Sequence, residues 1–179
     1  MKRILSVLVF SILLVNLQKV SAQAFDGKGD TKLLLGYANA KGYSAGQLKF
    51  EKGFSSLMSV GAAWTYFFIK DDPNTIGTDD PIAGIFDKSE FGIFLNFHLN
   101  KPLNLGDKSD LYIGPYTSLK STGVQGGYKY NFSERFGVYA EVSQGLFNVF
   151  DFSSETSSGS STYKTRTLIS AGLTINFIR

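Results

Sequence analysis

The chain has 179 residues, no cysteine, and 18 basic against 15 acidic side chains. The lack of cysteine excludes the disulfide framework that stabilises many small secreted domains, and the length suits a single domain.

The first residues have the pattern of a secretory signal peptide. Lys2 and Arg3 form a positive head, and residues 4–17 are almost all apolar. This run is shorter than the ~20 residues that a membrane-spanning helix needs. Small residues at Val20-Ser21-Ala22 then suit cleavage. We therefore predict a signal peptide over residues 1–22, with cleavage after Ala24 as the alternative.

Cleavage would also change the charge balance. The predicted signal contains Lys2, Arg3 and Lys19 and no acidic residue, so residues 23–179 have 15 basic and 15 acidic side chains. A nucleic-acid-binding protein needs a basic surface. We expect no nucleic-acid partner.

The rest of the chain alternates apolar and polar residues, with Gly, Asn, Asp and Ser between the alternating runs. This pattern predicts β-strands. We expect eight strands, at 31–38, 45–51, 57–70, 89–99, 110–119, 123–130, 136–146 and 163–177. Pro115 predicts a local break in the hydrogen-bond ladder of the fifth strand.

The expected connections differ in length. Tight turns near 52–56 and 131–135 and a moderate one at 100–109 contrast with two long loops, 71–88 and 147–162. The long loops fall only on alternate connections. They would therefore leave the same end of an up-and-down array.

The less apolar face of the strands consists mostly of Gly, Ala, Ser, Thr, Asn and Gln, with few charges. A solvated face would favour long charged side chains, so this face suits the interior of a narrow barrel. Aromatic residues gather near both ends of the apolar face, as in membrane barrels: Tyr66, Phe68, Phe91 and Tyr163 at one end, Phe97, Tyr130 and Phe177 at the other. We predict an all-β fold: a single eight-stranded antiparallel up-and-down transmembrane β-barrel over residues 23–179. A secreted, soluble, lipocalin-like binding barrel is an alternative.

Five charged residues lie at strand positions whose side chains are expected to face the inside of this barrel. They are Lys32, Lys49, Glu51, Lys129 and Glu141. A buried charge needs a partner, so we expect a structural network of ion pairs in the lumen. Lys129 and Glu141 lie on adjacent strands, and we expect them to pair.

The final strand, TLISAGLTINFIR, and the alternating strands before it resemble the small outer-membrane barrels of the OmpA membrane-domain and OmpX type. The stretches VSAQ, AFDGKGDTK and GFSSLMSVGAAWTYFF are similar to an uncharacterised family of small Bacteroidetes outer-membrane proteins. The resemblance implies a location in the bacterial outer membrane. This sequence departs from the family pattern at its C-terminus. Such barrels usually end on an aromatic residue, whereas Phe177 is followed here by two more residues.

His98, the only histidine, is predicted to face the lumen. Some outer-membrane barrels are lipid-modifying hydrolases that use histidine with serine, but no motif places a serine beside His98. We favour a hydrogen-bonded structural histidine. A small outer-membrane lipid-modifying hydrolase remains the alternative, and we predict no catalytic residues, no cofactor and no metal.

Asp71, Asp72, Asp79 and Asp80 form an acidic loop. An EF-hand read from Asp72 would have Ile76 and Ala83 at ligand positions, so we favour a solvated loop over a calcium site. We expect a non-enzymatic barrel with a lumen filled by side chains and outer-membrane lipid around it. It would act through loops 71–88 and 147–162, including the Ser/Thr-rich run 153–162, or as an accessory of a larger envelope complex.

Overall fold

The computed structural model describes residues 23–40, 43–68, 88–119, 121–148 and 167–177. The predicted signal peptide and nearly all of loops 71–88 and 147–162, with their acidic and Ser/Thr-rich stretches, lie outside these residues. No helix in the described part is long and apolar enough to cross a membrane.

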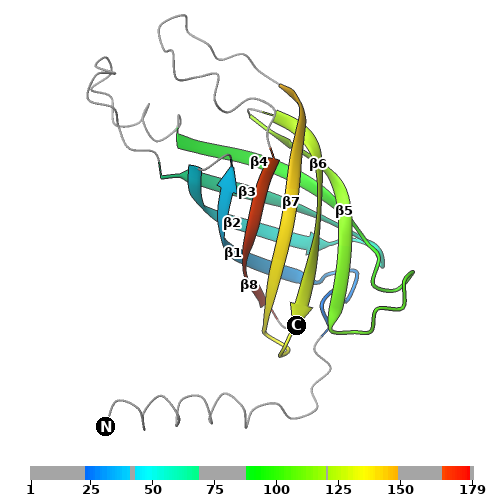
Figure 1. Cartoon of the computed structure of the whole chain (residues 1–179). Coiled ribbons are helices and arrows are strands. Elements are labelled where there is room, and N and C mark those ends of the chain that lie inside the picture. The colour runs from blue at the N-terminus through cyan, green and yellow to red at the C-terminus, as the bar shows by residue number, and fades with distance from the viewer. Residues whose placement is uncertain (1–22, 41–42, 69–87, 120, 149–166, 178–179) are drawn as a thin grey trace, which may run out of the picture.

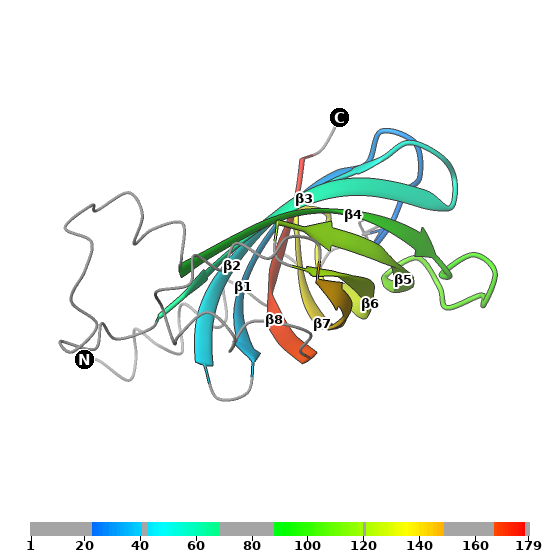
Figure 2. The same ribbon diagram turned by 90° about the horizontal axis from the view of Figure 1, so that it is seen from above.

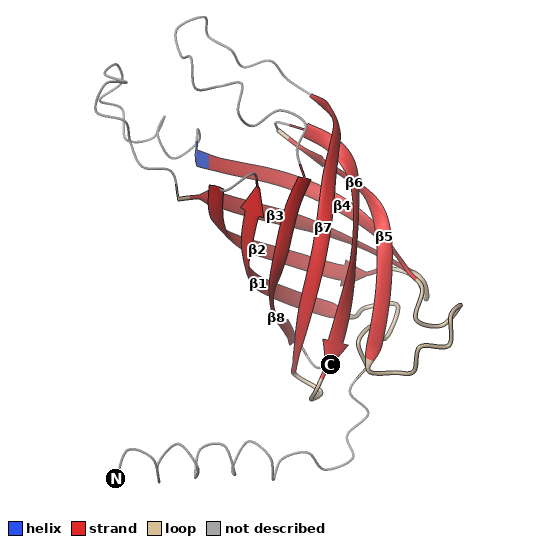
Figure 3. Ribbon diagram, viewed as in Figure 1, coloured by secondary structure: helices blue, strands red, loops and turns tan. Residues whose placement is uncertain are grey.

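Eight antiparallel strands form a closed barrel in which each strand pairs with its neighbours in chain order and β8 pairs with β1. Figure 1 shows this order, and Figure 2 shows the strands from above. Strands account for nearly all of the regular structure (Figure 3). Their bounds are β1 Thr31–Ala40, β2 Tyr43–Gly53, β3 Met58–Phe67, β4 Ser89–His98, β5 Ser109–Ser118, β6 Ser121–Asn131, β7 Phe136–Asn148 and β8 Thr167–Asn176.

The eight predicted strands are therefore confirmed, with ends that differ by a few residues. The expected break at Pro115 is also present. β4 pairs with β5 at residues 92–94 and again at 97–98, in the same register. Between these two segments of the described strands, Gly114 and Pro115 have no paired residue on β4. Proline has no N–H to donate to the ladder.

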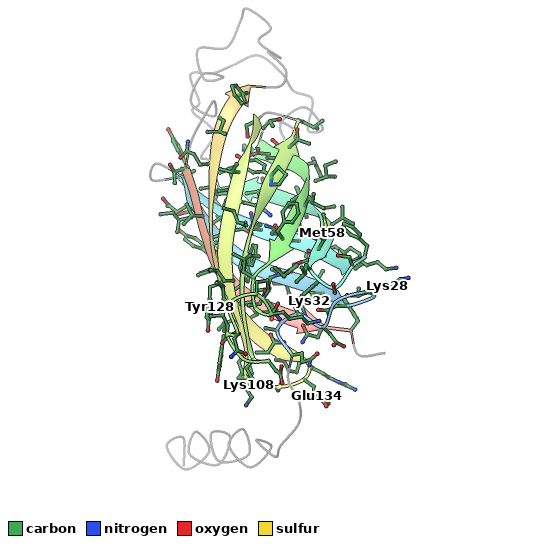
Figure 4. The ribbon with its side chains drawn as sticks, turned by 90° about the vertical axis from the view of Figure 1, so that its right-hand side faces the viewer. Lys28, Lys32, Met58, Lys108, Tyr128 and Glu134 are labelled. Carbon is green, nitrogen blue, oxygen red and sulfur yellow. The ribbon has the colours of Figure 1, made fainter. Side chains whose placement is uncertain are left out.

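The connections β2–β3, β4–β5 and β6–β7 lie at the end of the barrel where β1 begins and β8 ends; we call it the turn end (Figure 1). The opposite end is the loop end. Figure 4 shows Lys108 and Glu134 at the turn end.

The outer surface of the barrel is apolar. Aliphatic side chains occupy its middle, including Leu35, Ile93, Ile113, Val142 and Ile169, each at least 43% exposed. Exposed aromatic residues lie toward both ends: Tyr37, Trp64, Phe68 and Phe91 toward the loop end, and Phe54, Phe97, Tyr130 and Phe177 toward the turn end. The predicted Tyr163 lies outside the described residues.

Phe94, which interrupts the predicted alternation of β4, faces the lumen like Gly92 and Asn96. Glycine on the next strand makes room for it, because a Cβ on Gly61 would lie 2.2 Å from the Phe94 ring. The inward Tyr112 and Tyr139 likewise lie against Gly127 and Gly36. The lumen is thus filled by large rings packed against strand positions that have no side chain.

Candidate functional site

The lumen is polar. Among the residues that the structure describes, twenty polar or charged residues are buried against ten apolar ones. Buried charges require partners, so the arrangement of these side chains determines whether the lumen is stable.

One ion pair lies in the middle of the lumen. The Lys49 ammonium is 2.7 and 2.6 Å from the two carboxylate oxygens of Glu141. It also donates to Gln125 Oε1 at 3.3 Å and lies 4.3 Å from the centre of the Phe94 ring. The Tyr112 hydroxyl donates to Glu141 Oε2 at 2.8 Å. The pair is therefore enclosed and its carboxylate is held from two sides.

A second ion pair lies nearer the turn end. Lys129 Nζ is 2.6 Å from Glu51 Oε2 and 3.9 Å from Asp110 Oδ2. The expected pairing of Lys129 with Glu141 is wrong: each binds a residue of β2 instead. Tyr112 lies between the pairs, with its ring 4.3 Å from Lys129 Nζ and its hydroxyl on Glu141. The lumen is narrow enough for Lys49 and Lys129 each to reach a glutamate across it.

Lys32 has its partners at the turn end. Its ammonium is 2.9 Å from Asp30 Oδ2 and 3.0 Å from Asn176 Oδ1. Figure 4 shows Lys32 inside the barrel and Tyr128 on its outer wall.

His98 links the second pair to two further residues. Its Nδ1 lies 2.7 Å from Asp110 Oδ2, and its Nε2 lies 2.8 Å from Ser59 Oγ and 3.2 Å from Glu51 Oε1. Ser59 Oγ donates to Glu51 Oε1 at 2.6 Å. We name Glu51, Ser59, His98, Asp110 and Lys129 the histidine cluster.

Sequence reasoning missed Ser59 as a neighbour of His98, although the alternation of β3, with Met58 and Val60 on the apolar face, turns Ser59 toward the lumen. The pairing of Ser59 with Asn96 places the Ser59 side chain next to that of His98, and this register cannot be read from alternation. Phe25 was also missed, because it precedes the first strand. Its ring is stacked on His98, with the ring centres 3.4 Å apart and the planes at 5°.

A serine, histidine and aspartate at these distances have the geometry of an activated nucleophile. Two observations count against that chemistry. The Ser59 hydroxyl donates to Glu51 Oε1, so the serine proton points to a carboxylate rather than to Nε2 of His98. Ser59 and His98 are also at most 1% exposed, so no substrate reaches them in this structure.

A cavity lies between the Lys49–Glu141 pair and the loop end. About 50 Å³ of it is open to the centres of water molecules, which is room for about three or four. Apolar residues such as Ala63, Ile93 and Leu168 line it together with hydroxyl and amide groups of Thr65, Ser118, Ser121, Gln125 and Ser143. Within the described part of the chain, no group of His, Asp or Glu is arranged to hold a metal ion.

The fold is similar to that of a solved β-barrel domain. The N-terminal β-barrel domain of Pseudomonas aeruginosa OprF matches with a TM-score of 0.53 and 11% identity, over 84% of this chain and 99% of that one. The de novo designed TMB2.3 matches with a TM-score of 0.48 and 11% identity, over 86% of this chain and 98% of that one.

No curated protein matches the chain. A family model matches residues 14–174 of the chain. The chain belongs to a family of unknown function, DUF6646.

Proposed function

We propose that this protein is a non-enzymatic outer-membrane β-barrel whose eight strands span the bilayer. Its side-chain-filled lumen does not serve as a pore, and it acts through its extracellular loops or as an accessory of a larger envelope complex. The observation that carries the proposal is the inverted polarity of the barrel: ion pairs are buried inside and apolar side chains are exposed outside. A soluble lipocalin-like barrel would have the opposite arrangement.

Further observations support the membrane location. The strands have 10 to 13 residues, and about 9–11 suffice for a tilted strand to cross the hydrocarbon. Exposed aromatic residues lie at both ends of the apolar surface, where membrane barrels have aromatic girdles. The likeness to the OprF barrel domain supports the fold on which this proposal depends.

The location is tested by expressing the full chain, with its own N-terminus, in a Gram-negative host. We expect the protein in the outer-membrane fraction, with Gln23 as the first residue by mass spectrometry. Recovery from the periplasm or the medium without detergent would contradict the proposal.

The contacts among Ser59, His98 and Asp110 favour one second candidate, a lipid-modifying hydrolase. A fluorophosphonate, which phosphonylates activated serines with loss of fluoride, distinguishes the two functions on the purified, folded barrel in detergent. We expect no labelling of Ser59. Labelling that is lost in both Ser59→Ala and His98→Ala would favour the hydrolase.

A further inference from the structure

We infer that residues 23–30 form an intramolecular plug that seals the turn end of the barrel, and that Phe25 anchors this plug on the histidine cluster. The inference concerns the closed barrel itself and does not depend on the proposed membrane location.

The backbone of the segment is bound to parts of the barrel that lie around its mouth. Asn131, at the end of β6, donates from Nδ2 to the Gln23 carbonyl at 2.7 Å. The Ala24 amide donates to the carbonyl of Asp107 in the β4–β5 connection at 2.7 Å. Residues before the first strand are thus held by the far side of the barrel.

The same segment is held on the near side of the mouth. The Gly29 amide donates to the Gly53 carbonyl at 2.7 Å, and the Gly53 amide donates to the Asp30 carbonyl at 2.7 Å, so the segment is joined to the end of β2. A further bond comes from the β4–β5 connection, where Asn100 Nδ2 donates to the Phe25 carbonyl at 3.2 Å. Together these contacts run across the mouth from β2 to β6.

The side chain of Phe25 fills the opening. It is 2% exposed, and its ring covers one face of His98 in a parallel stack. The two ring nitrogens of His98 contact Asp110, Ser59 and Glu51, and its ring centre lies 6.2 Å from that of Tyr112, with the planes at 41°. Phe25 is therefore what separates this face of the histidine cluster from the solvent at the turn end.

Two glycines allow the segment to fold back into the barrel. Gly27 and Gly29 have φ of 98° and 88°, which residues with a Cβ rarely adopt. The plug also needs Gly53, because a Cβ there would lie 2.0 Å from the Gly27 carbonyl oxygen. The stretch GKGD, Gly27 to Asp30, thus forms the bend that seats the plug.

The chain has no cysteine, so a single thiol introduced under Phe25 reports on the seal. Ser59→Cys places it in the histidine cluster. The experiment compares the rate at which iodoacetamide alkylates this thiol, in detergent micelles, in three proteins: Ser59→Cys alone, with Phe25→Ala, and with Phe97→Ala. Phe97 is the matched control, because it is next to His98 in the chain but 41% exposed on the outer wall.

With the plug in place, the thiol of Ser59→Cys should react far more slowly than in the unfolded protein. Phe25→Ala removes the buried ring and should accelerate the reaction about a hundredfold. Phe97→Ala should leave the rate unchanged. Equal rates in the first two proteins, with both shown to be folded, would overturn the inference, as would a wild-type plug that leaves the thiol as reactive as in the unfolded chain.

Amide exchange provides a second measurement should Phe25→Ala prevent folding. In the unmodified protein the Ala24 amide, bound to Asp107, should exchange as slowly as amides within β1. Asn100→Ala with Asn131→Ala removes two hydrogen bonds to the plug and should accelerate Ala24 exchange about tenfold or more. Fast Ala24 exchange in the unmodified protein would show that the segment is not seated.

Discussion

Two inward-facing lysines of this barrel, Lys49 and Lys129, pair with glutamates across the lumen. Alternation in the sequence indicates that Lys49, Glu51, Lys129 and Glu141 share a face, because that depends only on a period of two. It does not indicate that Lys49 binds Glu141 and Lys129 binds Glu51. Those pairs depend on strand tilt and on which side chain fills the space between, here Tyr112.

The pairing can be tested by a double-mutant cycle. Lys49→Ala or Glu141→Ala alone leaves one charge buried without its partner and should each lower the free energy of unfolding by ~3–5 kcal/mol. The double variant should cost clearly less than the sum, whereas Lys129→Ala and Glu141→Ala should be nearly additive. Urea unfolding in vesicles measures both cycles. Additivity for Lys49 and Glu141 would contradict the observed pairing.

Glycines that face the lumen give a second prediction at this scale. A Cβ on Gly127 would lie 2.5 Å from the Tyr112 hydroxyl and 2.6 Å from the Ala140 carbonyl oxygen. Gly127→Ala should therefore lower the free energy of unfolding by ~1–3 kcal/mol.

Gly126 is the matched control for this change, because it lies on the opposite face and its nearest contact would be an ordinary 3.4 Å. Gly126→Ala should change the stability by less than ~0.5 kcal/mol. Equal costs at both positions would show that Tyr112 does not occupy the space above Gly127.

Each strand has one face buried in the lumen and one face exposed on the outer surface. In β7, Tyr139, Glu141 and Ser143 are buried, while Val138 and Val142 are exposed. The sequence predicts such strands well because each residue's face follows from its position alone. It predicts Phe94 poorly, because the space for that ring comes from Gly61 on another strand. The plug is missed for a similar reason. Phe25 is not part of an alternating run of residues, and the space that its ring fills beside His98 exists only after the barrel closes.

The two faces of β7 predict how an introduced charge should behave. Val142 pairs with Gly126 and Ile169 near the middle of the wall and is 48% exposed. The proposed membrane location predicts that Val142→Arg lowers the free energy of unfolding in phospholipid vesicles by ~2–4 kcal/mol, because a charge at mid-membrane is poorly solvated.

Phe136 lies on the same face at the first position of β7. Phe136→Arg should cost only ~0–1 kcal/mol, because the headgroup region solvates the charge. A small cost at both positions would mean that the outer face of β7 meets water, and the soluble barrel would then become the better interpretation.

At the scale of the whole molecule, the closure of the barrel and the burial of its charged side chains depend on each other. The buried ion pairs are enclosed only because β1 and β8 join through residue pairs that run from Lys32–Asn176 to Asn39–Ile169. An open sheet would expose both the lumen charges and two unpaired strand edges. Near the loop end, the cavity described above has space for a few water molecules.

This dependence predicts that the last strand decides whether the barrel forms. The intact protein, refolded from urea into detergent, should migrate differently on a denaturing gel before and after boiling, because a closed barrel has no edge at which unfolding can start. Deleting residues 167–179 removes β8, leaves β1 and β7 unpaired on one side, and should abolish the difference. Lys52→Ala, at an exposed position of β2, should retain it. A truncated protein that still shows the shift would mean that the β1–β8 pairing is not what closes the barrel.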